Sequence, residues 1–205
     1  MAHDFSLMRV MLNGGWAVAL LLGLSVLALG ILIDRWRAFS RAGRDRVALL
    51  RSLEPFWGGK NLEECLKTCE RDGSVAALSV AAGVRAKMGK SLEPHAAMER
   101  EAKALLLKLE TRLPLLGTLG NLSPYVGLFG TVLGIIRAFR DLALASSGGA
   151  AVVSQGIAEA LISTAVGLFV AVVASASYNL FQSKLDKLAR EAELVMDEAS
   201  ERLNP

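Results

Sequence analysis

The chain has 205 residues and a formal net charge of +3; 53% of its residues are hydrophobic and only 6% are aromatic. That length would suit one or two soluble domains, but the apolar residues are gathered into long runs and are not spread as a soluble core would spread them. A nucleic-acid-binding face would need basic residues clustered beside aromatic ones on one folded surface, and the sequence indicates no such face, so the net charge is not a nucleic-acid signature.

Three runs contain no Asp, Glu, Lys or Arg: residues 10–33, 113–136 and 160–183, each 24 residues long. A helix of that length spans about 36 Å, and the hydrocarbon layer of a bilayer is about 30 Å thick. We therefore predict three transmembrane helices. A cleaved signal peptide is an alternative for the first run, because Ala28-Leu29-Gly30 loosely fits a cleavage site. Against it, Arg9 is the only cation before the run, and the run is longer than an ordinary signal sequence.

Cations flank these runs unevenly. Arginines follow the first run closely, basic residues lead into the second, and the N-terminus and the link between runs two and three carry few. Because cytoplasmic loops are enriched in Lys and Arg, residues 34–112 and 184–205 are predicted to be cytoplasmic. Residues 1–9 and the link 137–159 are then periplasmic, and Ser146-Ser147-Gly148-Gly149 is the stretch of the link expected to be flexible.

The cytoplasmic segments are predicted to be helical extensions of the membrane helices. The first helix is expected to continue to Pro55 and Gly58-Gly59, and shorter helices follow over 61–70 and 74–88. A longer helix starts near Ser91, Glu93 and Pro94, with nothing in the sequence to stop it before the second run. In residues 184–205, apolar positions recur among charged ones with helical spacing, as in Leu185 and Leu188, which predicts an amphipathic helix.

Cys65 and Cys69 lie four residues apart on the 61–70 helix, where they would share one face. Two thiols begin a metal site, but a structural zinc usually needs four ligands, and His3 and His95 are far away in the sequence. Reduced cytosolic thiols are the favoured interpretation. No metal, cofactor or enzymatic constellation is predicted.

Small residues form stripes on the second and third runs: Gly130, Gly134 and Ala138 on one, Ser163, Gly167 and Ala171 on the other. In lipid, helices associate by close packing through such residues. The stripes therefore predict a tight helix pair, formed either within one chain or between copies.

Hydroxyl and amide side chains also collect on these two runs, Thr131, Ser163 and Thr164 among them. They suggest a water-accessible surface, and three helices cannot enclose one, so an oligomer is expected. Ion-driven membrane proteins need a titratable group within the membrane. Here no carboxylate lies in the middle of a run, and Glu159 lies at the outer boundary. If ions drive this protein, a second polypeptide should supply the central carboxylate.

SPYVGLFGTVLGI in the second run and GIAEALISTAVGLFVAVVASASYNLF in the third resemble the signature helices of the ExbB/TolQ/MotA family of ion-driven motor subunits, most closely the ExbB/TolQ branch. The resemblance implies an all-α protein of the bacterial inner membrane, assembled as a pentameric ring around two helices of an ExbD/TolR-like single-span partner. That partner's aspartate would take up protons. Related subunits drive outer-membrane transport, envelope maintenance or gliding, and a TonB- or TolA-like protein is a further expected partner.

The resemblance also implies roles for individual residues. Thr131 falls on the family's pore threonine, Thr164 on the threonine of its ALxxTA motif, and Glu159 on the preceding glutamate, with Ser163 beside them. The remaining matched positions imply helix packing and partner contact; they are Pro124, Tyr125, Gly127, Gly130, Gly134, Gly167 and Ala171. One position departs from the pattern: members commonly carry a proline where this chain has Val173.

Three functions remain open from the residues. In an ion-driven motor, Thr131 and Thr164 line the path, and protons are favoured over sodium. In a passive oligomeric channel or small transporter, Glu159 itself would be the gate or ion site. In a structural scaffold, the cytoplasmic helices would recruit other proteins, and the polar membrane residues would have no role.

Overall fold

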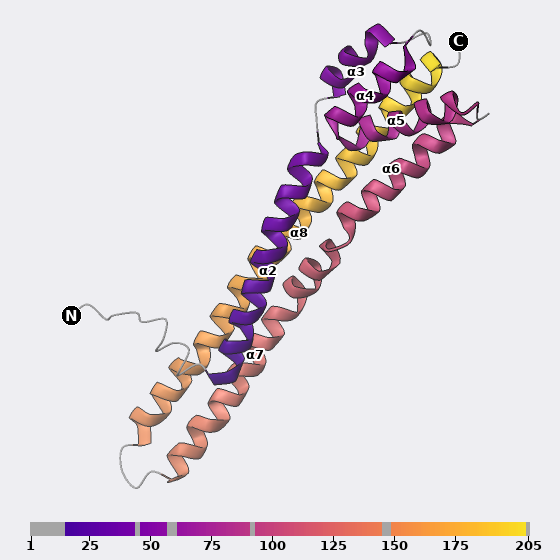
Figure 1. The fold of residues 1–205 in the computed structure, drawn as a ribbon. Helices are drawn as coiled ribbons and strands as arrows, with labels where there is room; N and C mark the ends of the chain where they lie inside the picture. Colours follow the sequence, from indigo (N-terminus) through magenta and orange to yellow (C-terminus); the bar gives the residue numbers. More distant parts are fainter. Residues whose placement is uncertain (1–14, 44–45, 57–60, 91–92, 145–148, 204–205) are drawn as a thin grey trace. The chain divides into compact units, whose positions relative to one another are not determined.

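The computed structural model describes residues 15–43, 46–56, 61–90, 93–144 and 149–203, and within them all regular structure is helical (Figure 1). Three stretches are long and apolar enough to cross a membrane; they lie in α2, in the α6–α7 stretch and in α8. This confirms the all-α class and the three predicted membrane helices. The helices are α2 (Gly15–Ala42), α3 (Arg46–Leu53), η1 (Glu54–Phe56), α4 (Leu62–Asp72), α5 (Val75–Met88), α6 (Pro94–Glu110), α7 (Leu113–Leu144) and α8 (Gly149–Leu203).

The chain divides into two compact units. The first, which we call the membrane unit, comprises residues 1–32 and 114–179, and the second unit comprises 33–113 and 180–205. The membrane unit holds the apolar parts of α2, α7 and α8. The second unit holds the ends of these helices together with α3, η1, α4, α5 and α6.

The prediction that the first helix continues to Pro55 is wrong. α2 ends at Ala42, Gly43 follows it, and a separate helix, α3, begins at Arg46. Glycine is a poor helix former, and it interrupts the helix here although the apolar pattern continues. The predicted stop at Gly58-Gly59 lies outside the described residues.

The next two helices end as predicted, within two residues. Asn61 precedes α4, although its side chain makes no capping hydrogen bond, and Gly73 ends the helix with a φ of 70°, a left-handed conformation that glycine adopts without strain. The Ser74 hydroxyl accepts a hydrogen bond from the Ala77 backbone N–H at 3.3 Å and so caps α5. Gly89 ends α5.

The predicted continuous helix into the second membrane span is also interrupted: α6 ends at Glu110 and α7 begins at Leu113. Pro114 explains the break, because it has no N–H for the Glu110 carbonyl and its ring crowds that carbonyl. The freed carbonyls at the end of α6 find other donors. Arg35 Nη1 donates to Lys108 O at 3.2 Å and to Leu109 O at 2.9 Å.

An ion-pair group holds this break together. Asp34 accepts hydrogen bonds from Arg35 Nη2 at 2.7 Å and from Arg112 Nη1 at 2.9 Å. The Arg35 hydrogen bond, with the charges of Arg35 and Arg112, lowers the pKa of Asp34 below its ordinary value of 3.8. The stability that ionised Asp34 contributes is therefore fully present above pH 3.8, and it is lost as the pH falls through the lowered pKa.

The predicted link 137–159 is mostly helical. α7 continues to Leu144 and α8 already begins at Gly149, while Ser146, Ser147 and Gly148 lie outside the described residues. Residues 150–160 are rich in alanine, the best helix former, which explains why a segment that contains Ser and Gly still forms a helix. The periplasmic location of this segment stays a prediction.

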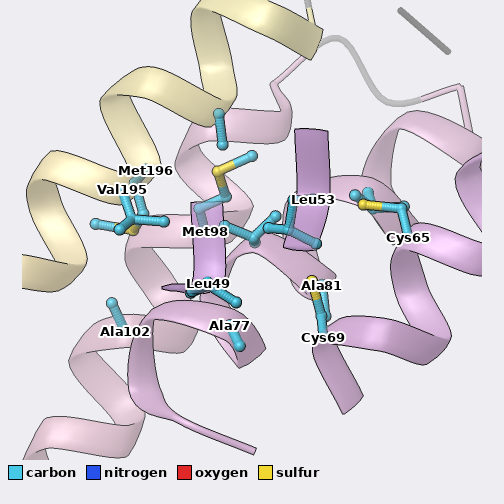
Figure 2. Packing of buried hydrophobic residues seen from close by; sticks show 13 residues of the cluster. Leu49, Leu53, Cys65, Cys69, Ala77, Ala81, Met98, Ala102, Val195 and Met196 are labelled. Atoms are coloured by element: carbon cyan, nitrogen blue, oxygen red, sulfur yellow. The ribbon is translucent and has the colours of Figure 1, made fainter. Parts of the chain in front are cut away.

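The core of the second unit forms where α3, α4, α5 and α6 meet α8 (Figure 2). Met98 of α6 is fully buried and crosses α5 at Gly83, where a Cβ would collide with the Met98 Cε. Glycine at 83 thus makes room for the methionine. Val195 and Met196 of α8 belong to the same core.

Cys65 and Cys69 are free thiols buried in this core. The neighbouring Cys65 thiol and burial raise the pKa of Cys69, so Cys69 stays protonated at neutral pH. Within the described residues, no three His, Cys, Asp or Glu side chains form a group that could hold a metal ion. The two cysteines are small core residues, and the interpretation as reduced thiols fits their surroundings.

We expect Met98→Ala to destabilise the second unit by about 2–5 kcal/mol, because it leaves a cavity in a packed core. Met88→Ala is the matched control, since Met88 ends α5 with 43% of its surface exposed. Thermal unfolding of the purified chain, followed by circular dichroism, measures both. Equal melting temperatures for the two variants would contradict the core described here.

Candidate functional site

Helices α7 and α8 approach each other so closely that even the Cβ atom of an alanine is excluded at several positions. A Cβ built on Gly167 would lie 2.6 Å from the Ser123 carbonyl oxygen and 3.0 Å from Gly127 Cα. One built on Gly134 would lie 2.5 Å from Ala160 Cβ. Real Cβ atoms essentially never come this close to other heavy atoms, so glycine is needed at both positions.

These contacts form an antiparallel seam with a repeat of about seven residues over its central part. Gly120 lies opposite Ser175, Gly127 opposite Gly167, Gly134 opposite Ala160, and Ala138 opposite Gly156. On α7, positions 120, 127 and 134 are seven apart; on α8, their partners at 175, 167 and 160 are eight and seven apart. A seven-residue repeat keeps one stripe of a helix facing its neighbour over many turns, and we call this stripe the small-residue seam.

Three hydroxyls meet inside the seam. Thr131 Oγ1 is hydrogen-bonded with Thr164 Oγ1, and lies 3.3 Å from Ser163 Oγ and 3.2 Å from the carbonyl oxygens of Gly127 and Ala160. Ser163 Oγ donates to Gly127 O at 3.0 Å and to Ala160 O at 2.8 Å. Thr164 Oγ1 donates to Gly127 O at 3.2 Å. We call Thr131, Ser163 and Thr164 the hydroxyl cluster.

The cluster has more hydrogen-bond contacts than protons. Each hydroxyl carries one proton and can also accept, so three protons are shared among seven contacts. Several arrangements of these protons are therefore available without moving the backbone. Such a cluster can donate to an approaching anion or accept from an approaching acid.

The members of the cluster differ in exposure. Ser163 and Thr131 are buried, with 1% and 7% of their surface exposed, whereas Thr164 is partly open. A group from outside the chain would therefore meet Thr164 first. Thr131 is reached through Thr164, to which it is hydrogen-bonded.

Glu159 lies outside this cluster, beside a cavity of about 330 Å³ in the membrane unit. Its carboxylate accepts a hydrogen bond from Gln155 Nε2 at 3.1 Å. Arg137 and Asp141 also line the cavity, as does Ala160. Since the Ala160 carbonyl accepts from Thr131, the cavity reaches the residue next to the hydroxyl cluster.

The packing residues named from the sequence fall into two sets. Gly127, Gly134 and Gly167 lie in the seam within one chain. Gly130 faces both α2 and α8, since a Cβ there would lie 2.6 Å from Ala17 Cβ and 2.8 Å from Ser163 Oγ. The other three are Pro124, half-buried inside α7, Ala171, buried, and Tyr125, 68% exposed.

Val173, the position that departs from the pattern expected in the sequence analysis, lies within the unbroken helix α8. Its carbonyl accepts a hydrogen bond from the Ser177 hydroxyl at 2.7 Å. Valine keeps the backbone N–H that proline lacks, so nothing at this position interrupts the helix.

Sequence reasoning missed part of the seam. Gly120, Ser175 and Gly156 take part in the close contacts, but the predicted stripes used a spacing of four residues and passed over them. A seven-residue spacing from Gly134 and Gly127 would have found Gly120, but Ser175 lies eight residues from Gly167 and Gly156 four from Ala160, so no single spacing in the sequence marks all three.

Residues 73–194 match the MotA/TolQ/ExbB proton channel family. The chain belongs to this family. The matched segment contains the hydroxyl cluster, Glu159 and the whole of α7. This protein is accordingly a transmembrane subunit of a proton channel family.

Named relatives cover most of the chain. It is 36% identical to the Tol-Pal system protein TolQ of Pseudomonas aeruginosa, over 76% of this chain and 75% of that protein. Identity to the Tol-Pal system protein TolQ of Haemophilus influenzae is 32%, over 88% and 84%. The biopolymer transport protein ExbB of Pseudomonas putida is 31% identical, over 88% of this chain and 58% of that protein.

We expect Gly167→Ala to destabilise the membrane unit by about 1–3 kcal/mol, because the added methyl overpacks a contact made by backbone atoms. Gly23→Ala is the control: its Cβ meets nothing within 4 Å, and alanine favours a helix. The midpoint of heat-induced aggregation of the purified chain in detergent reports both. If Gly167→Ala melts like Gly23→Ala, the close approach of α7 and α8 is wrong.

Proposed function

We propose that this protein is the ring-forming subunit of an inner-membrane motor driven by the proton-motive force. With a single-span partner like ExbD or TolR, it would convert proton flow into mechanical work on the cell envelope. The names of its relatives give two settings for that work, the Tol-Pal system and biopolymer transport. A TonB- or TolA-like protein is the expected recipient of the movement.

The observation that carries the proposal is a hydroxyl cluster without an acid of its own. Thr131, Ser163 and Thr164 offer donors and acceptors inside the membrane unit. None of the three charge-free runs contains a carboxylate. Proton transport through a membrane needs a group that takes up and releases the proton, so we assign that group to the partner.

The outer surface of the membrane helices supports an oligomer. Large apolar side chains of α7 are exposed on the single chain, including Leu122, Phe129, Ile136 and Tyr125 with 52–68% of their surface exposed. Lipid covers such residues in a monomer, and neighbouring subunits or the partner helix would cover them in a ring. Because the glycines of the seam are used within the chain, the ring contacts would be made by these larger side chains.

The proposed energy scale is small. One proton moving through 100 mV releases about 2.3 kcal/mol, which is comparable to a few packing contacts. A partner helix can therefore turn against the ring only if its contacts are shallow. The hydroxyl cluster is suited to such shallow contacts, because the arrangement of its protons can change while the small-residue seam stays packed.

The proposed topology follows the cation distribution, with the N-terminus periplasmic and residues 34–112 and 184–205 cytoplasmic. In this orientation the cavity beside Glu159 faces the periplasm. It would admit protons or water to the end of the hydroxyl cluster.

Thr131→Val with Thr164→Val should lower proton flux at least tenfold, because valine keeps the shape of threonine and removes the hydroxyl. Thr118→Val is the control, since its exposed hydroxyl on α7 bonds only to the Pro114 carbonyl in the described structure. Proteoliposomes that contain the chain and its copurified partner, with a pH-sensitive dye inside, measure the flux. Full flux in the double variant, with assembly intact, would remove the hydroxyl role.

A partner-independent channel is the alternative, and the carboxylate of Glu159 beside the cavity favours it. The motor proposal expects a single-span, aspartate-bearing protein to copurify, and expects no proton flux from this chain alone. Under the channel alternative the chain conducts alone, and Glu159→Gln abolishes that flux. Flux in planar bilayers that contain only this chain distinguishes the two.

A further inference from the structure

The second unit contains a basic pocket that the proposed motor mechanism does not use. A cavity of about 270 Å³ lies between the end of α2, the start of α5 and the end of α6. Three cationic residues line it, namely Arg35, Arg41 and Lys108, and no described acidic residue does. The rest of its lining is mostly aliphatic and includes Leu78, Leu105 and Leu109.

The charge of this pocket is not balanced by the described residues. Arg35 is buried and pairs with Asp34, but Asp34 also pairs with Arg112. Arg41 and Lys108 have exposed side chains, and neither forms an ion pair with another described residue. Three cations thus line the pocket, and Asp34, the carboxylate paired with Arg35, is shared with Arg112, which lies outside the lining, so the pocket favours an anion.

The place of the pocket in the sequence matches the headgroup layer of a membrane. Arg35 follows the first charge-free run by two residues and Arg41 by eight, which along a helix corresponds to about 3 and 12 Å. The polar layer outside the hydrocarbon core is about 5–8 Å thick on each side. Two of the cations therefore bracket the depth of lipid phosphates, and the leucine side chains offer a surface for the first carbons of an acyl chain.

We propose that this pocket binds the headgroup of an anionic phospholipid of the leaflet that faces the second unit. The lipid phosphate would lie between Arg41 and Lys108, and Arg35 would add its charge from the buried side. Basic pockets beside membrane helices are suited to such headgroups. A bound lipid would join the ends of α2 and α6, which otherwise meet there through Arg35 and Asp34.

This proposal rests on the membrane location of the chain and not on proton transport or on the partner. It can therefore be tested on the purified chain alone. Dioctanoyl-phosphatidylglycerol is the probe, dioctanoyl-phosphatidylcholine is the zwitterionic comparison with no net charge, and native mass spectrometry of the detergent-solubilised full chain counts bound lipid. Inorganic phosphate and glycerol phosphate are added as competitors to separate a lipid site from a site for soluble phosphate.

Phosphatidylglycerol should bind the natural chain at least tenfold more tightly than phosphatidylcholine. Arg41→Gln with Lys108→Gln should weaken it roughly 25-fold, at about fivefold for each cation lost near an anionic group. The matched control is Arg37→Gln with Arg100→Gln, which removes the same charge from exposed positions outside the pocket and should change binding less than twofold. Ala38→Leu keeps every cation, occupies the pocket and should also weaken binding.

Each other result overturns the proposal. Equal binding of the two lipids would show that the pocket does not select anions. Equal losses in the pocket and control variants would mean that the lipid responds to net charge alone. If millimolar inorganic phosphate competed for the pocket as strongly as phosphatidylglycerol does, the pocket would be assigned to a soluble anion. If the double variant does not fold, unchanged binding in Ala38→Leu remains decisive against a lipid in the pocket.

Discussion

The close approach of α7 and α8 is the constraint on which the membrane unit depends. In lipid there is little gain from burying apolar side chains against each other, so helices associate through backbone proximity and polar contacts. A stripe of small residues spaced seven or eight apart on each helix permits that proximity. It also sets the register, because shifting one helix by a single residue would place branched side chains against the opposite backbone.

The hydroxyl cluster follows from this register. Thr131 reaches the carbonyl of Ala160 on the other helix only because the backbones are close there. Buried hydroxyls need partners, and the cluster supplies them in excess. Conversely, the same contact brings no carboxylate to the cluster, which is why proton movement by this chain is proposed to require a second protein.

The sequence was sufficient to predict those parts of the fold that a pattern over many residues specifies. The three charge-free runs predicted the membrane helices, and Gly73 and Ser74 marked helix boundaries by their own backbone chemistry. It was insufficient where one residue overrides a pattern, as Gly43 and Pro114 do when they interrupt helices whose apolar pattern continues. The partners of the glycines were also beyond it, because a stripe of small residues does not say which helix it faces.

The candidate site, like the fold, was predicted only in part from the sequence. Thr131, Ser163 and Thr164 were predicted as path residues from motif and polarity, but their mutual hydrogen bonds depend on the register of two helices about thirty residues apart in the chain. The basic pocket of the second unit gave no motif at all, since its cations come from two helices far apart in the chain, Arg35 and Arg41 from α2 and Lys108 from α6.

Disulfide formation between Thr131→Cys and Ser163→Cys tests the register most directly, in a chain with Cys65 and Cys69 replaced by alanine. The two hydroxyl oxygens lie 3.3 Å apart within one chain, so sulfur atoms in their places need only small side-chain rotations to reach the S–S distance of about 2.05 Å. The account predicts rapid oxidation within single chains, and none for Thr131→Cys with Val170→Cys, one seam repeat away. Cross-links between different chains, or equal yields for the two pairs, would contradict it.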